Sequence, residues 1–131
     1  MTDLVDLTLR EWRSHPFIYG ASDCMLSCGK YVAAAGGRDI TGDFLGRYST
    51  QGEALEIMEA HGGAGGLFAE MGLERVEGKP RRGDLLEIIH TEIDTIGALC
   101  TGSGVAVRLE RGVAEVDLRF VKWRGAWRVV S

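Results

Sequence analysis

The residue in this sequence best placed to do chemistry is a cysteine at the predicted start of a helix. Cys24 directly follows Asp23, a good N-cap, and the helix is predicted to run to residues 33–35 and to stop at the glycine pair 36–37. Unpaired N–H groups and the helix dipole lower the pKa of a thiol there and can stabilise an oxyanion. The pattern is typical of a nucleophilic thiolate. It also fits a simpler interpretation, in which Asp23 only caps the helix and Cys24 is a small buried hydrophobe.

Short motifs in a fixed order extend this pattern over nearly the whole chain. Tyr19-Gly20-x-x-Asp23-Cys24 heads the helix, Gly83-Asp84-Leu85-Leu86 opens a strand, and residues 96–102 follow as another strand. This order resembles the NlpC-type papain-like cysteine peptidases, which hydrolyse peptidoglycan stem peptides. It is more similar still to an offshoot found near the tail genes of bacteriophages and prophages. The further motifs shared with that offshoot are Trp12, Gly46-Arg47-Tyr48, Ala54-Leu55, Gly97 and Ala126-Trp127-Arg128-Val129.

The resemblance implies roles for single residues. Cys24 matches the nucleophile, Tyr19 the aromatic residue near the oxyanion, and Asp84 a structural aspartate at the start of a strand. It places the catalytic histidine two residues before Gly97, where this chain has Thr95. Threonine is no base near neutral pH, so whether the protein is an enzyme stays open.

Two functions follow from the resemblance. The first is a tail-associated cysteine peptidase or amidase of a phage, prophage or gene-transfer agent, which uses Cys24 on cell-wall peptides. The alternative is a catalytically inactive structural or assembly component of the tail tip or baseplate that keeps the peptidase fold. Both imply a protein that is made in the bacterial cytoplasm and carried in the virion. Its partners would be tail or baseplate proteins, with peptidoglycan peptides as ligands in the first case. A third, weaker class is a cytosolic regulatory or immunity-type domain.

A histidine on the neighbouring strand offers a substitute base. If residues 91–94 form a four-residue hairpin loop, His90 lies directly opposite Thr95, with Cβ atoms about 5 Å apart on the same face of the sheet. We therefore include His90 with Cys24, Tyr19 and Asp23 in the predicted catalytic set, the alternative being an exposed hairpin histidine. His15 and His61 are predicted to lie at helix ends as caps or surface residues.

No cofactor or metal is predicted. Cys24 and Cys28 share a helix face, and Cys100 with His90 could complete a zinc set, but structural zinc sites usually use C-x2-C knuckles from loops. Cys28 and Cys100 are therefore predicted to be core residues. No glycine-rich phosphate-binding motif lies between a strand and a helix, so nucleotide binding has no support.

The elements that must position these residues form one α+β domain spanning residues 1–131. Helices come first and an antiparallel sheet second, which is a papain-like or NlpC-like arrangement with the Cys24 helix packed on the sheet. The predicted helices are one over residues 4–12 that ends before Pro16, the Cys24 helix, and helices over residues 51–60 and 66–71. The predicted strands are residues 84–90, 96–101, 105–109, 113–116 and 127–130.

Charge and composition argue against several functional classes of protein. The net charge of −4 argues against binding duplex nucleic acid through phosphates. The only basic cluster alternates with Trp123 and Trp127 near the C-terminus, and we predict a terminal strand there rather than a single-strand stacking platform. No run approaches the ~18 apolar residues of a membrane span, and the acidic N-terminus indicates no signal peptide. An odd count of three cysteines favours a reducing compartment.

The sequence holds 19 glycines, and most are expected at helix ends and turns. The run at residues 62–66 is interpreted as a loop, either a mobile lip of the Cys24 cleft or a flexible connection. Gly46-Arg47-Tyr48 could contact a partner or a carboxylate ligand. We favour a structural role, with Arg47 paired to Asp43 or Asp39 and Tyr48 packed on the sheet.

Overall fold

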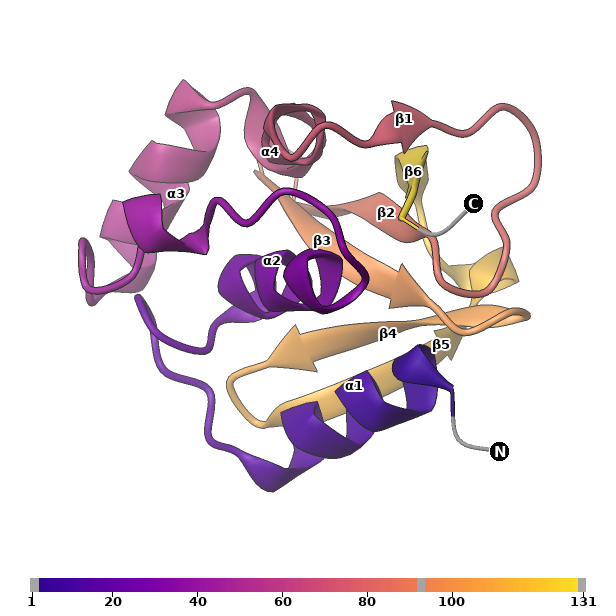
Figure 1. The fold of residues 1–131 in the computed structure, drawn as a ribbon, viewed down its shortest axis with the longest axis horizontal. Helices are drawn as coiled ribbons and strands as arrows, with labels where there is room; N and C mark the ends of the chain where they lie inside the picture. The colour runs from indigo at the N-terminus through magenta and orange to yellow at the C-terminus, as the bar shows by residue number, and fades with distance from the viewer. Residues whose placement is uncertain (1–2, 92–93, 130–131) are drawn as a thin grey trace.

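The computed structural model describes residues 3–91 and 94–129, and these form an α+β fold (Figure 1). The helices are α1 (Leu4–Ser14), α2 (Cys24–Ala34), α3 (Gln51–Ala60) and α4 (Gly63–Glu70), with the one-turn 3-10 helices η1 (Thr41–Asp43) and η2 (Leu118–Phe120). The strands are β1 (Glu74–Arg75), β2 (Leu85–Thr91), β3 (Asp94–Cys100), β4 (Gly104–Leu109), β5 (Gly112–Asp117) and β6 (Trp123–Arg128). The predicted fold class is therefore confirmed at the α+β level.

All six described strands join one antiparallel sheet in the order β1-β6-β2-β3-β4-β5. Strands β2 to β5 follow one another as a meander, and β6 returns to pair with β2 on its other side. Two points differ from the sequence prediction. The short edge strand β1 was not predicted, and the last strand begins at Trp123 rather than Trp127.

Polar side chains determine where three of the helices begin. Asp3, Asp23 and Thr50 each accept a hydrogen bond from a backbone N–H in the first turn, at α1, α2 and α3 respectively. Such caps satisfy N–H groups that have no partner within the helix. The predicted starts of α2 and α3 are thereby confirmed, and α1 ends before Pro16 as expected.

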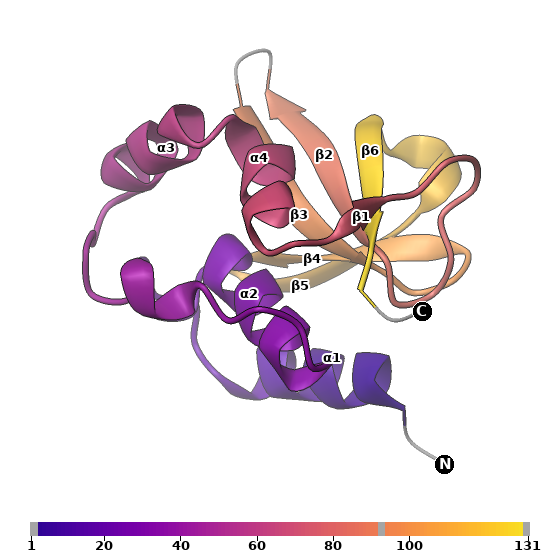
Figure 2. The same cartoon turned by 45° about the horizontal axis from the view of Figure 1, so that its top comes forward.

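The sheet buries side chains on both faces because apolar residues occupy successive positions of its central strands. Leu85 and Leu99 pack in a core with α1, α2 and α4, whereas Leu86 and Cys100 belong to a second core on the opposite face. Figure 2 shows the helices gathered on one side of the curved sheet, with α3 lying beyond α4. Cys28 lies in the first core, so both cysteines predicted to be core residues are buried.

The basic C-terminal segment is a strand that is tied to the sheet by ion pairs. Arg128 donates to both oxygens of the buried Asp84, at 2.9 and 3.2 Å, and Asp84 also accepts from the backbone N–H of Arg81. Trp127 is buried in the first core, where its ring packs against Phe68. The terminal-strand prediction is confirmed. The role that the resemblance gave to Asp84 agrees with a carboxylate that holds β6 against the start of β2.

Candidate functional site

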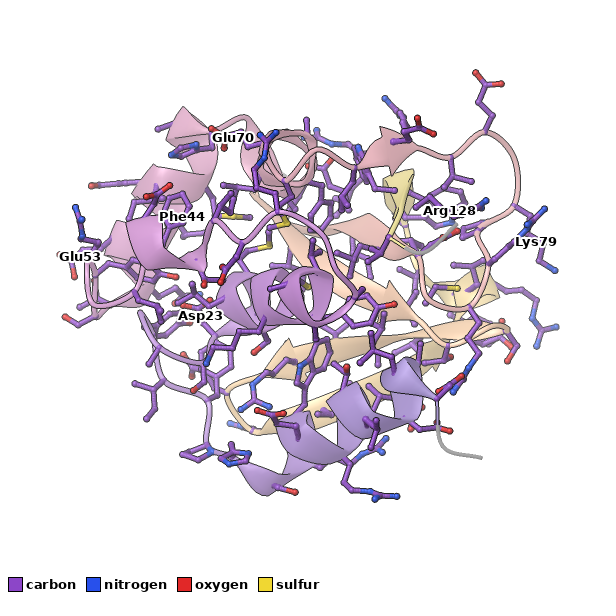
Figure 3. All side chains as sticks on the ribbon, viewed as in Figure 1. Asp23, Phe44, Glu53, Glu70, Lys79 and Arg128 are labelled. Carbon is purple, nitrogen blue, oxygen red and sulfur yellow. The ribbon has the colours of Figure 1, made fainter. Side chains whose placement is uncertain are left out.

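The candidate site begins at the N-terminal end of α2, where Cys24 is the first helical residue. Its thiol is half-buried, whereas Cys28 and Cys100 are fully buried. Burial raises the pKa of the Cys28 thiol and of the Cys100 thiol, so both favour the neutral form. Figure 3 shows Asp23 at this end of α2, on the same side of the molecule as Phe44 and away from Arg128. Among the three cysteines, Cys24 is the one placed for reaction.

Asp23 does more than cap the helix. One carboxylate oxygen accepts from the N–H of Leu26 at 3.0 Å, and the other accepts from the N–H of Gly20 and from the hydroxyl of Tyr48. Gly20 has φ +82°, and a Cβ there would lie 2.0 Å from the carbonyl oxygen of Tyr48. Only glycine permits this close approach, so the turn before Cys24 is fixed against the segment that carries Tyr48.

Tyr48 makes a contact beside Cys24 that the sequence did not predict. Its side chain is buried, and its hydroxyl donates to Asp23. Burial and the hydrogen bond to the Asp23 carboxylate raise the pKa of Tyr48 well above its usual value. Tyr48 is thus a neutral donor that holds the capping carboxylate in place.

Cys24 and Tyr19 line a cavity of about 360 Å³. The Tyr19 hydroxyl is hydrogen-bonded to Glu110 in the turn between β4 and β5, and burial together with this bond raises the pKa of Tyr19. The Tyr19 ring also packs edge-on against Phe17, with centroids 5.0 Å apart. The structure therefore brings together three of the predicted site residues: Cys24, Tyr19 and Asp23.

Thr95, at the position that the resemblance assigns to the catalytic histidine, also lines this cavity. Its hydroxyl donates to Glu87 at 2.9 Å and accepts from the N–H of Ala64 at 3.2 Å. Glu87 is buried and receives two bonds from Arg124, at 2.8 and 3.0 Å. Burial would raise the pKa of Glu87, but bonds from Arg124, Thr95 and the N–H of Gly65 outweigh it and lower the pKa below its usual value. The hydroxyl of Thr95 is thus part of a buried hydrogen-bonded network with Glu87 and Ala64.

The strand register corrects the argument for His90. Thr95 pairs with Ile89, and a register shift between Ile89 and Thr91 leaves His90 outside the regular pairing. Since β2 extends to Thr91 and β3 begins at Asp94, the expected four-residue loop over residues 91–94 is also wrong. The side chain of His90 lies outside the described part of the chain. The geometric reason for choosing it as a base is therefore lost.

The remaining histidines lie at helix ends as predicted. His15 follows α1, and its Nδ1 lies 3.0 Å from the carbonyl of Glu11; His61 follows α3, and its Nδ1 lies 2.6 Å from a carboxylate oxygen of Glu70. No histidine is found among the described side chains that line the cavity. The candidate zinc set is not assembled in the described residues, because Cys28 and Cys100 lie in cores on opposite faces of the sheet.

A family model described as "Domain of unknown function (DUF6950)" matches residues 2–129. The chain belongs to this family. No curated protein matches the chain, and no solved structure does. The DUF6950 match spans every element that builds the Cys24 site, from α1 to β6.

The structure also reveals a buried arginine of this DUF6950 chain that the sequence prediction missed. Arg108 on β4 is 3% exposed, and it donates to backbone carbonyls at the end of α1 and in the connection to α2. The carbonyls that accept from it belong to Trp12, His15, Pro16 and Ser22. Burial lowers its pKa. The signal available in the sequence was a charged residue directly after the apolar run 105–107, where a core-facing position would be expected to be apolar.

Among the described residues, none of the helices combines the length and the apolar character that crossing a membrane requires.

Proposed function

We propose that this member of the DUF6950 family is a phage or prophage tail-associated protein with an NlpC-like, papain-like fold, in which Cys24 is a nucleophile toward cell-wall peptides. In this proposal the protein is carried in the virion and contacts other tail or baseplate proteins. The tail context is supported by the order of motifs from Trp12 to Val129. The chemistry is supported chiefly by one observation: Cys24 begins α2 and lines the cavity, while the two other cysteines are buried in the cores.

The proposed reaction is transfer of an acyl group from nitrogen to sulfur and then to water. Cys24 releases its thiol proton to solvent and the thiolate adds to an amide carbonyl carbon; the C–N bond then breaks as the departing nitrogen takes up a proton from solvent water. Water then hydrolyses the thioester to a carboxylic acid and restores the thiol. Backbone N–H groups in the first turn of α2 would bind the developing oxyanion. Asp23 and Tyr48 fix that turn and do not touch the reacting atoms in this scheme.

One observation favours the second candidate, an inactive tail-tip or baseplate component with the same fold. The hydroxyl of Thr95 is occupied on both sides, by Glu87 and by the N–H of Ala64, so the position of the expected base carries a structural role. Loss of one member of a catalytic triad separates an enzyme from a scaffold that retains its fold.

The rate at which Cys24 reacts with a thiol probe distinguishes the two candidates. N-ethylmaleimide is reacted with the full chain at about pH 6, where a free thiol with a pKa near 8.5 is almost fully protonated. Glutathione serves as the free-thiol reference, and mass spectrometry identifies the modified cysteine. An activated nucleophile is expected to react at least about tenfold faster than glutathione, because the helix terminus stabilises the thiolate.

Cys28 and Cys100 provide buried controls within the same molecule, and a Cys24→Ser variant removes the reactive site. A Cys24 rate no higher than that of glutathione would overturn the nucleophile proposal and favour the structural candidate. In that case, particles carrying Cys24→Ser are expected to assemble as the wild type does, with the same tail proteins co-purifying.

A further inference from the structure

The cavity beside Cys24 is walled mainly by apolar side chains from several elements. Its volume of about 360 Å³ is sufficient for a small ligand group. The apolar lining residues come from η1 and its flanks, from α3 and from α4, and include Ile40, Phe44, Leu55, Met58, Leu67 and Met71. Such walls favour burial of an apolar group and offer a charged group no compensation for lost hydration.

The polar groups on the inner wall are already engaged within the protein. Asp23 accepts from two backbone N–H groups and from Tyr48, and Arg108 donates to carbonyls of α1 and the following connection. The hydroxyl of Thr95 both donates and accepts within the structure. A carboxylate or ammonium group that approached these side chains would have to break one of their contacts or remain unpaired with them.

The exposed charges at the cavity lie in the turn between β4 and β5. Glu110 and Arg111 are adjacent and of opposite sign, so this turn gives no strong preference for a ligand of either charge. The bond between Tyr19 and Glu110 connects this turn to the segment before α2. The Glu110 carboxylate at the cavity entrance is thus already engaged by Tyr19, just as the polar groups on the inner wall are engaged within the protein.

We propose that the cavity binds an uncharged, apolar side chain of a peptide, in the residue next to the carbonyl that Cys24 attacks. This inference rests on the proposed function and adds the substrate class: peptides with an apolar rather than an acidic residue at that position. The occupant is an apolar side chain because the walls are apolar and the inner polar groups are saturated. It belongs to a peptide because the proposed acceptor of the thiol attack is an amide.

Two maleimides of different apolar size test the cavity directly. The rates of Cys24 modification by N-cyclohexylmaleimide and N-ethylmaleimide are measured, and their ratio is divided by the same ratio for glutathione. We expect a normalised ratio of about ten or more, because each additional buried CH₂ group favours binding in the cavity. In a second arm, N-acetyl-leucinamide is expected to protect Cys24 from N-ethylmaleimide, whereas the amide of N-acetyl-glutamate is not.

Variants on α3 provide the matched controls. Ala54 lines the cavity, so Ala54→Trp fills it and is expected to bring the normalised ratio to about one. Ala60 is exposed on the same helix and absent from the lining, so Ala60→Trp is expected to keep the wild-type ratio. Ala54→Leu introduces a smaller side chain and replaces Ala54→Trp in the test if the tryptophan variant does not fold. It is expected to lower the normalised ratio in part.

The outcomes separate this inference from the proposed function. A wild-type ratio equal to that of glutathione, or equal protection by the two amides, overturns the apolar-peptide inference even if Cys24 is highly reactive. If the normalised ratio is high but Cys24 reacts slowly with N-ethylmaleimide, the cavity is supported as a binding site. The proposal that Cys24 is an activated nucleophile is then overturned. If the maleimide ratio is high but neither amide protects Cys24, the cavity binds apolar groups that do not belong to a peptide, and the peptide part of the inference is overturned.

Discussion

At the scale of single residues, the side chains of Thr95 and Glu87 connect the sheet to the start of α4. The resemblance expects a proton acceptor at residue 95, but the threonine hydroxyl joins Glu87 to the N–H of Ala64 at the start of α4. Glu87 also accepts from the N–H of Gly65. The hydroxyl of Thr95 and the carboxylate of Glu87 therefore each satisfy one N-terminal N–H group of a helix that has no capping side chain of its own.

The lowered pKa of Glu87 predicts a specific dependence of stability on pH. A carboxylate whose folded-state pKa lies below its unfolded value of 4.5 stabilises the folded state above that value, and the effect is lost as the pH falls through the folded pKa. We expect Glu87→Gln to lower the free energy of unfolding by about 1–3 kcal/mol at neutral pH. The difference from wild type should shrink from about pH 5 downward.

Urea unfolding of both proteins at a series of pH values provides the measurement. Glu59→Gln, at an exposed position on α3, is the control and should change stability little at any pH. A wild-type advantage over Glu87→Gln that stays constant into acid would show that the carboxylate is not the stabilising form.

At the scale of elements, the glycine run at residues 62–66 is not a loop, because α4 begins inside it at Gly63. The interpretations as a mobile lip or a flexible connection are corrected accordingly. A Cβ at Gly65 would lie 2.7 Å from Glu87 and from Trp127, and a Cβ at Gly66 would lie 1.7 Å from the carbonyl oxygen of His61. The helix can approach the sheet and the preceding turn this closely only because these positions have no side chain.

This requirement predicts opposite effects of two glycine-to-alanine changes. Gly65→Ala removes a helix-weakening glycine but forces a methyl group against Glu87 and Trp127, and we expect a net loss of about 1–3 kcal/mol. Gly52→Ala in α3 meets no atom within 4 Å, so its effect should be a gain of up to about 1 kcal/mol from helix propensity. Urea midpoints measure both. A stabilised Gly65→Ala variant would contradict the close packing of α4 on Glu87.

At the scale of the whole molecule, local patterns predicted most of the helices and strands but not the contacts between distant ones. Capping residues and apolar spacing were sufficient to predict α1, α2 and α3, because the interactions that set their ends lie within a few residues. The pairing of Thr95 with Ile89 continues the regular register of β2 and β3, and the irregularity follows between Ile89 and Thr91; no residue pattern in the sequence specifies either. The start of α4 was missed because glycine is a poor helix former in isolation, and here a carboxylate from β2 compensates.

For the candidate site too, residues close together in the sequence were predicted and distant partners were not. Cys24, Asp23 and Tyr19 were identified because they are adjacent in the sequence and sit at one helix end. Tyr48 reaches Asp23 from 25 positions away, and Arg108 reaches α1 from more than 90, so their partners could not be read from the chain. These contacts form only in the tertiary fold, which brings Tyr48 to Asp23 and Arg108 to the end of α1.

Arg108 makes the helical half and the sheet dependent on each other, and this leads to a prediction for the whole molecule. An ammonium group has fewer donors than a guanidinium and lacks its planar fork, so Arg108→Lys leaves several of the carbonyls of Trp12, His15, Pro16 and Ser22 without a partner. The bond to the Trp12 carbonyl is buried and the others are partly buried, so we expect a loss of about 1–3 kcal/mol in the free energy of unfolding.

The same variant should loosen the connection that carries Phe17 and Tyr19, both of which line the cavity. Hydrogen exchange is expected to rise in residues 15–22 more than in the sheet, because opening of this connection no longer breaks four hydrogen bonds to one side chain. Arg111→Lys, at an exposed position in the next turn, is the matched control and should leave stability and exchange close to wild type. An Arg108→Lys variant with unchanged exchange over residues 15–22 would show that α1 and its connection are held to the sheet by apolar packing alone.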